Sequence, residues 1–263
     1  MEYLFYNGFN FLAFPVNFLA VLFLLTGTWI LHRYYSHTSV VHWLTSVPAT
    51  LLFTGIIILL LIIEGIWAFQ LFRTYFFIFF LLILILILGL VTLKKIQAFN
   101  TRNLLFILNH GGLWLALTAA LFGAPDREEY KMIAPLHQPE YNAIDQNGIL
   151  HPLPFTVRLD QFELEYYPQQ QNQKVPKRFC SNLTLQSKEN TIQMPVEVNR
   201  PVSFKGYSLY QDGYDQSRGP NSEYSILLVV RDPWISLVYT GIFMLLAGAM
   251  GLIIYGPLKK HSL

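Results

Sequence analysis

The sequence predicts a multi-span α-helical membrane protein of about five transmembrane helices, with an extracytoplasmic antiparallel β domain of sandwich or barrel-like form inserted before the last helix. Hydrophobic residues make up 53% of the 263-residue chain and charged residues only 13%, which is too apolar for an ordinary soluble protein. Several apolar stretches are long enough to cross a bilayer. Between the last two of them, the helical period of hydrophobic residues gives way to strict alternation, which is typical of strands.

The apolar stretches cover residues 11–31, 47–69, 75–93, 104–122 and 235–255. At a rise of 1.5 Å per residue, each can cross a hydrocarbon core of about 30 Å. The stretch 75–93 has no polar face, so we expect it to meet lipid on all sides. The chain thus divides into an N-terminal membrane region of four spans (1–122), a β-rich domain (123–234), and a C-terminal span with a basic cytoplasmic tail (235–263).

Basic residues predict the orientation of these spans. Lys94, Lys95 and Arg102 flank the turn between the third and fourth spans, and Lys259 and Lys260 follow the last one. Lys and Arg near the ends of spans favour the cytoplasmic side. We therefore expect the segment 123–234 and the N-terminus to lie outside the cytoplasmic membrane.

The segment 123–234 reads as a set of short strands. Leu153, Phe155, Val157 and Leu159 alternate with polar residues and so share one face of a strand. Further strands are expected at 162–166, 182–186, 194–198, 203–210 and 224–230, separated by turn-forming residues. The stretch 199–215 has the composition of packed core and turn rather than of an active site. Trp234 stands where an aromatic-belt residue would mark re-entry into the membrane.

Composition and motifs exclude several classes of function. The net charge of +2 comes without a basic patch, so nucleic acid is not expected as a partner. A single cysteine, Cys180, excludes an internal disulfide and any multi-cysteine metal site, and we expect it to be a small packed residue. Because no Ser-His-Asp, P-loop or paired-carboxylate pattern stands out, we predict no catalytic residues and no metal site.

His110 is the main candidate for a binding role. It lies within the fourth span, in the run Asn109-His-Gly-Gly-Leu-Trp114, where an ionisable side chain needs a reason. A neutral imidazole there could ligate haem iron, with Gly111 and Gly112 allowing a flat group or another helix to approach. It could equally make a hydrogen bond between helices. Taken alone, the residue pattern favours the hydrogen bond.

Other ionisable residues in the membrane region carry weaker signals. Glu64 lies near the outer end of the second span, where we expect it to stay hydrated at the interface. His32, His37 and His42 crowd the first cytoplasmic connection, which we interpret as a solvated interfacial loop. The roles of these four residues stay open.

Four motifs give the chain a resemblance to the ResB family, also called CcsB, of cytochrome c biogenesis, and especially to its short bacterial form in the Bacteroidetes. They are Leu-Asn-His-Gly-Gly-Leu-Trp-Leu-Ala-Leu at 108–117, Leu-Pro-Phe-Thr-Val-Arg-Leu-Asp-Gln-Phe at 153–162, Val-Asn-Arg-Pro-Val-Ser-Phe-Lys-Gly-Tyr-Ser-Leu-Tyr-Gln-Asp-Gly-Tyr-Asp at 198–215, and Val-Arg-Asp-Pro-Trp at 230–234. The order of spans, one β domain and a final span is also similar to that family.

The resemblance implies an accessory subunit rather than an enzyme, in the cytoplasmic (inner) membrane of a bacterium with its β domain in the periplasm. It implies a partner of the CcsA type, also called ResC, with which haem is moved outward and attached to apocytochrome c. A thioredoxin-like thiol reductant is a further candidate partner. His110 matches the position of a family histidine, which favours a haem ligand or a residue on the haem path over a hydrogen bond.

Two other functions stay open at this point. The protein could be a scaffold that positions the partner or apocytochrome c without ever touching haem. It could also be a membrane-anchored sensor or binding module, which would predict a closed ligand pocket in the β domain.

Overall fold

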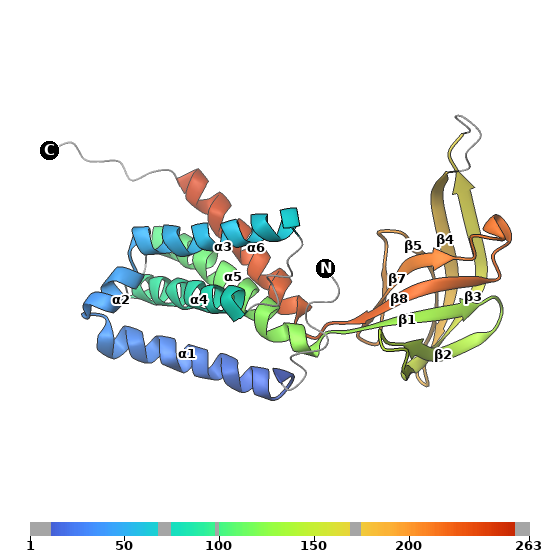
Figure 1. Cartoon of the computed structure of the whole chain (residues 1–263), viewed down its shortest axis with the longest axis horizontal. Coiled ribbons are helices and arrows are strands. Elements are labelled where there is room, and N and C mark those ends of the chain that lie inside the picture. The colour runs from blue at the N-terminus through green and yellow to red at the C-terminus, as the bar shows by residue number, and fades with distance from the viewer. Residues whose placement is uncertain (1–11, 68–74, 98–99, 169–174, 256–263) are drawn as a thin grey trace. The chain divides into compact units, whose positions relative to one another are not determined.

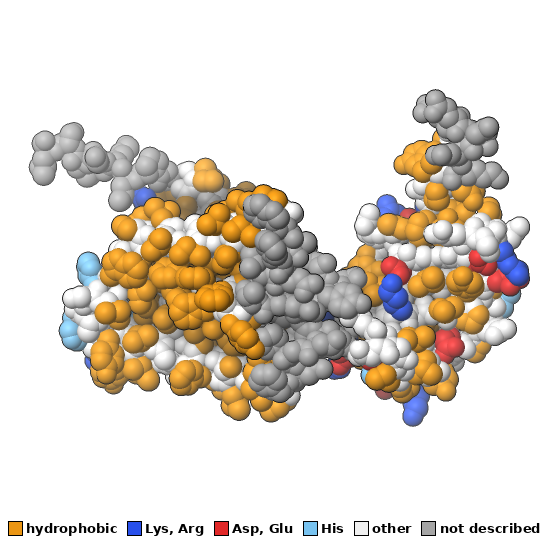
Figure 2. Space-filling view, in the orientation of Figure 1, with side chains coloured by type: hydrophobic (Ala, Val, Ile, Leu, Met, Phe, Trp, Pro, Cys, Tyr) orange, Lys and Arg blue, Asp and Glu red, His pale blue; other side chains and the backbone are white. Residues whose placement is uncertain are grey.

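The computed structural model describes residues 12–67, 75–97, 100–168 and 175–255. Two compact units emerge, a helical one formed by both ends of the chain and a β unit spanning residues 127–233 (Figure 1). Residue 11, residues 68–69 and the basic residues Lys259 and Lys260 lie outside the described residues. On the face in Figure 2, hydrophobic side chains dominate the helical unit, whereas most Lys, Arg, Asp and Glu side chains belong to the β unit.

Among the described residues, five helices are long and apolar enough to cross a membrane, as predicted. They are α1 (Val16–Tyr35), α3 (Val47–Trp67), α4 (Tyr75–Ile96), α5 (Thr101–Gly123) and α6 (Ile235–Tyr255). The start of α5 is set by Asn100, whose side chain accepts a hydrogen bond from the backbone N–H of Asn103 at 2.9 Å. A short helix, α2 (Ser39–Leu44), stands where a loop was expected, and Thr38 caps it.

The expectation that the third span meets lipid on all sides is wrong. Helix α4 packs against α1, α3 and α5. Its middle holds the buried residues Leu84, Ile85, Ile87, Leu88 and Leu90. A helix that is hydrophobic all round suits the interior of a bundle as well as lipid, so periodicity could not distinguish the two environments.

Helices α5 and α6 pack through glycines that let their backbones touch. A Cβ atom at Gly241 of α6 would lie 2.5 Å from the backbone nitrogen of Ala116 and 2.6 Å from the carbonyl oxygen of Gly112, both on α5. About two helical turns further along α6, a Cβ at Gly248 would lie 2.7 Å from the carbonyl oxygen of Leu105 on α5. Small residues at matched positions are what close packing of helices in a membrane requires.

The β unit is an eight-stranded antiparallel sheet that curls toward a barrel. The strands are β1 (Glu128–Pro135), β2 (Pro139–Ile144), β3 (Leu150–Tyr166), β4 (Pro176–Gln186), β5 (Thr191–Glu197), β6 (Val202–Phe204), β7 (Tyr207–Tyr214) and β8 (Tyr224–Arg231), in the order β5-β4-β3-β2-β1-β8-β7-β6. The two edge strands, β5 and β6, are consecutive in the chain and lie close together, so the sheet nearly closes on itself. This agrees with the predicted barrel-like form.

The predicted strands differ from the observed ones at three places. The expected strands 153–159 and 162–166 are one long strand, β3, with an irregularity between Leu159 and Gln161. The expected strand 203–210 is a hairpin of β6 and β7. Strands β1 and β2 were not anticipated. The alternation itself is confirmed, because Leu153, Phe155, Val157 and Leu159 are all buried in the core.

The β6–β7 hairpin turns on two residues with positive φ, Lys205 at 50° and Gly206 at 83°. Such a two-residue turn matches the twist of the paired strands, and glycine adopts it without strain. A Cβ atom at Gly206 would meet no atom within 4 Å, so the obstacle to a small substitution there is the backbone conformation.

Replacing Gly206 by valine is therefore expected to destabilise the β unit by about 1 to 2 kcal/mol, because a β-branched residue resists positive φ. The readout is thermal unfolding and the amount of protein in membranes. Ser203→Val is the matched control, since Ser203 is exposed on the neighbouring strand. Normal stability with loss of function in Gly206→Val would instead make this turn a docking surface.

Candidate functional site

His110 lies near the middle of α5 and stacks on Phe106, one helical turn earlier. The two ring centroids are 3.7 Å apart and the planes differ by 13°. Lys95, at the end of α4, holds its ammonium 5.6 Å from the centroid of the Phe106 ring. The Nδ1 atom of His110 is buried and makes no hydrogen bond of good geometry with the described residues, although the backbone carbonyl of Phe106 is close enough to act on the imidazole. A buried imidazole nitrogen without a partner costs free energy unless something else binds it.

The residues next to His110 in its motif face different neighbouring helices. Asn109 donates from Nδ2 to the carbonyl oxygen of Leu245 on α6 at 3.1 Å, and Gly112 packs against the same helix. Gly111 faces the other way, where a Cβ would lie 3.6 Å from the Thr92 methyl of α4. The hydrogen bond between helices thus belongs to Asn109, which leaves His110 available for another role.

A haem ligand is compatible with this arrangement. The imidazole is a standard axial ligand of haem iron, and its unpartnered nitrogen is the kind of atom that a ligand would satisfy. No group of three or more His, Cys, Asp or Glu side chains within the described ranges could hold a metal ion.

The other ionisable candidates of the membrane region lie on or next to α1, α2 and α3, whereas His110 lies on α5. Nε2 of His32, at the end of α1, pairs with Nε2 of Gln97 at 3.1 Å. His42 lies in the last turn of α2, and His37 lies in the turn before that helix. Glu64 lies in the last turn of α3 and is half-buried.

The sequence interpretation missed a polar cluster at the end of the helical bundle where α5 ends and α6 begins. Asp126 closes the short 3-10 helix η3 (Ala124–Asp126) and accepts three hydrogen bonds. The donors are the backbone N–H of Phe14 at 2.7 Å, Nδ2 of Asn17 at 2.7 Å and Nε1 of Trp234 at 2.6 Å. The Asp126 carboxylate thereby ties the start of α1 to the regions that follow α5 and precede α6.

Trp234 is more than the interfacial marker that the sequence suggested. Its ring lies directly on Gly123, where a Cβ would come within 2.5 Å of the indole. The indole N–H then reaches Asp126. The motif Arg-Asp-Pro-Trp at 231–234 therefore ends in a side chain that is docked at both its ring and its nitrogen.

Replacing Asp126 by alanine is expected to lower the melting temperature of the purified protein clearly. Each hydrogen bond to a charged group contributes about 1.5 to 3 kcal/mol, and the substitution removes the acceptor of three donors, two at the start of α1 and one just before α6. Trp234→Phe is the graded comparison, because it keeps a ring over Gly123 and loses a single N–H. Equal melting temperatures for Asp126→Ala and the unaltered protein would mean that this cluster contributes no stability.

The β unit contains polar networks that hold turns and the core rather than a site. Asp145 accepts hydrogen bonds from the backbone N–H groups of Ile149 at 2.9 Å and Asn147 at 2.8 Å, and pairs with His151 at 3.1 Å. The Ile149 N–H, more than the other contacts, lowers the pKa of the Asp145 carboxyl. Cys180 is 2% exposed, as expected for a small packed residue.

The core of the β unit carries one buried hydrogen-bond network. The hydroxyls of Ser181 and Ser225 lie 2.7 Å apart, and Nε2 of Gln211 donates to the Ser225 hydroxyl at 2.7 Å. The three side chains come from β4, β8 and β7, which lie on both halves of the sheet. The network therefore links the two halves across the interior of the barrel, a structural role.

Two sequence comparisons support the resemblance drawn from the motifs. The chain is 28% identical to Protein NrfI of Wolinella succinogenes over 123 residues, which are 43% of this chain but only 13% of that protein. A solved structure of the cytochrome c heme lyase CcmF aligns with 76% of this chain and 34% of its own, at 16% identity and a TM-score of 0.38. Residues 100–222 match the ResB-like family. That segment contains His110 and three of the four motifs, so the match to the ResB-like family covers the candidate residue and most of the motifs.

Proposed function

We propose that the protein is an accessory subunit of cytochrome c biogenesis, which works with a CcsA/ResC-type membrane protein to move haem outward for attachment to apocytochrome c. The ResB-like segment starts at residue 100 and therefore includes all of α5 and its His110. The observation that carries the proposal is the unpartnered Nδ1 of His110, inside a membrane-spanning helix of that segment.

Haem is the cargo in this proposal, and His110 is the residue of this chain that contacts it. The imidazole would offer a neutral nitrogen to the haem iron without bringing a charge into the membrane. Phe106 stacks flat on the imidazole and limits its rotation. The covalent attachment to apocytochrome c is assigned to the partner, so this chain is not itself the enzyme.

The proposal places the β unit in the periplasm of a bacterium. Lys94 and Lys95 end α4, and Arg102 lies in the first turn of α5, so the connection between these helices is basic. Basic connections favour the cytoplasmic side. Helix α5 then crosses the membrane before β1 begins. There the β unit could meet apocytochrome c and a thioredoxin-like reductant that keeps its cysteines reduced.

Cysteine labelling tests this orientation. Because Cys180 is buried, the unaltered protein should not react with a membrane-impermeant maleimide, and it serves as the blank. Lys188→Cys, in the exposed loop between β4 and β5, should react in cells whose inner membrane is intact. Lys95→Cys should react only after that membrane is opened. The reverse pattern would show that the topology is inverted.

Reconstitution of cytochrome c maturation tests the function itself. A heterologous host without its own maturation system is given the CcsA/ResC-type partner, a reporter apocytochrome c, and this chain or an empty vector. We expect haem-stained cytochrome c only when this chain is present. Normal maturation without it would overturn the proposal. If maturation needs the chain but the purified complex shows no haem difference on loss of His110, the protein is a scaffold.

A further inference from the structure

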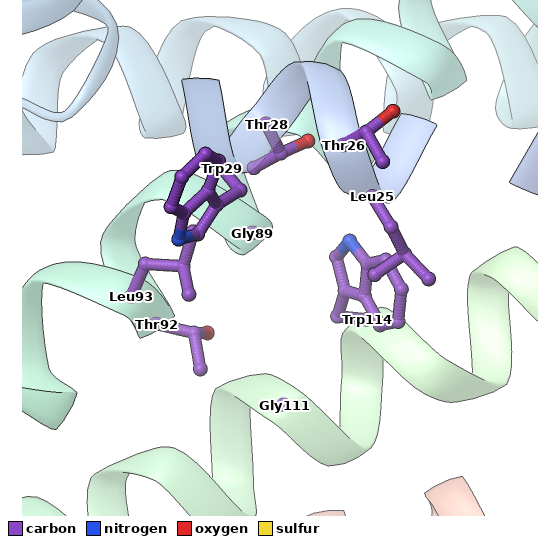
Figure 3. A pocket seen from close by; sticks show the side chains of 9 residues that line it. All are labelled: Leu25, Thr26, Thr28, Trp29, Gly89, Thr92, Leu93, Gly111 and Trp114. Carbon is purple, nitrogen blue, oxygen red and sulfur yellow. The ribbon is translucent and has the colours of Figure 1, made fainter. Parts of the chain in front are cut away.

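A pocket of about 430 Å³ lies among α1, α4 and α5 (Figure 3). Trp29 of α1 and Trp114 of α5 stand on different sides of it, and Gly89 and Gly111 leave room between the helices. Its remaining lining residues are Leu25, Thr26, Thr28, Thr92 and Leu93. A pocket of this size suits a small molecule or part of a larger one.

The lining of the pocket is neutral and contains no iron ligand. No charged residue contributes to it, and neither does any His, Met, Cys or Tyr. A carboxylate or phosphate would therefore enter an apolar site without a compensating charge, which is unfavourable. Haem would have no axial ligand there. His110 itself does not line the pocket, although its neighbour Gly111 does.

One hydrogen-bond donor in the pocket has no acceptor. The Nε1 atom of Trp114 is buried and unpartnered among the described residues, and it lies 3.2 Å from the point where a Cβ of Gly89 would stand. The threonine hydroxyls are already engaged. Thr28 and Thr92 donate to the carbonyl oxygens of Leu24 and Leu88, each at 2.7 Å, and Thr26 donates to that of Leu22 at 2.9 Å. A buried N–H without a partner in a membrane helix favours a ligand that brings an acceptor.

The pocket is accessible from the side of α1. Trp29 is 53% exposed and Leu25 43% exposed, in a helix that is apolar enough to span a membrane. Surface of this kind faces lipid, so a ligand would enter from the bilayer and not from water. The occupant must then be lipid-soluble and uncharged, with a flat part that fits beside indole rings and an oxygen that accepts a hydrogen bond.

We propose that this pocket binds the ring of a lipid-soluble quinone, with one ring carbonyl accepting the hydrogen bond from the Trp114 indole N–H. The isoprenoid tail leaves past Leu25 and Trp29 into the lipid. A phospholipid acyl chain could fill the same volume, but it has no acceptor at that depth and leaves the indole unpaired. The site is separate from His110, and this proposal does not depend on a haem role.

The test uses the full chain, purified into lipid nanodiscs, and an azido-naphthoquinone with a short isoprenoid tail as the probe. After illumination, the cross-link should map to α1, α4 or α5 residues of the pocket, and excess unmodified naphthoquinone should suppress it. Cross-linking spread evenly over the helices, or insensitive to that competitor, would mean that the probe only dissolves in the lipid and would overturn the proposal.

Variants at the pocket make the test specific. Gly111→Leu should reduce cross-linking at least tenfold, because its Cβ has room and its side chain fills the pocket. Gly27→Leu is the matched control and should bind like the unaltered protein, since a Cβ there meets nothing within 4 Å and the residue does not line the pocket. Trp114→Phe keeps a ring and loses the donor, so binding should weaken roughly two- to tenfold.

Two further variants distinguish a failure of this proposal from misfolding of Gly111→Leu and from a failure of the proposed haem role. Trp29→Ala, at an exposed position, should weaken binding without disturbing the fold, which covers the case that Gly111→Leu does not fold. His110→Gly should leave quinone cross-linking unchanged. Equal cross-linking in Gly111→Leu, Trp29→Ala and the unaltered protein would rule out this pocket and leave the proposed haem role untouched.

Discussion

Replacing Gly241 by valine is expected to remove most of the folded protein from the membrane. The backbones of α5 and α6 touch at this position, since even a single Cβ atom would lie 2.5 Å from the nitrogen of Ala116. Neither backbone can move aside without separating the helices along their length. The cost should exceed the roughly 1 to 3 kcal/mol that is typical of overpacking with a flexible neighbour.

Gly55→Val provides the matched control for this result. Gly55 lies in α3, and a Cβ there would meet no atom within 4 Å, so the same substitution only adds surface facing lipid. Membrane abundance and the detergent melting temperature are the two measurements. Comparable values for Gly241→Val and Gly55→Val would mean that the two helices are not packed as closely as the structure has them.

The second large effect is expected from His110→Gly, which should abolish or strongly reduce haem in the purified complex with the CcsA/ResC-type partner. The substitution removes a possible iron ligand while Asn109 and Gly112 keep their contacts with α6. Protein and partner levels should therefore stay near normal. Exogenous imidazole should partly restore the haem absorption, because it fits the vacated volume and supplies the same nitrogen.

Asn109→Ala distinguishes a ligand from a structural residue beside it. Loss of the Asn109 hydrogen bond should loosen α5 and α6 by about 0.6 to 2 kcal/mol and lower abundance, with the haem content per protein preserved. Haem content is read from the pyridine haemochrome spectrum, normalised to protein. If His110→Gly retains full haem occupancy, the ligand assignment has to be given up.

Much of the fold could be predicted because the membrane imposes simple rules. Length and hydropathy identified the five long helices of the described residues, and alternation placed Leu153, Phe155, Val157 and Leu159 in one core. The boundaries of the strands were harder to predict. The expected strand 203–210 ran through Gly206, but Gly206 and Lys205 make the turn between β6 and β7. That distinction depends on the signs of φ, which hydropathy does not report.

The candidate site was predictable only in part. An ionisable residue inside an apolar span drew attention to His110, but the sequence could not show that Asn109 makes the bond between helices and that the His110 Nδ1 is left without a partner. The contact between Trp234 and Asp126 could not be predicted from the sequence, for a different reason. They are far apart in the chain, and their contact exists only once α5 and α6 have paired.

Strands β1 and β8, the first and last strands of the β unit, have a consequence for how the chain is assembled. Strand β1 follows α5 after the short η3, strand β8 leads into α6, and the two strands are paired from Glu128 with Arg231 to Pro135 with Tyr224. The β unit thus leaves and re-enters the membrane region at neighbouring points, as an inserted domain with adjacent termini does. For α5 and α6 it is equivalent to the tight loop of a helical hairpin. In evolution, the β unit can therefore be enlarged, exchanged or reshaped without any change in the glycine-packed helices α5 and α6.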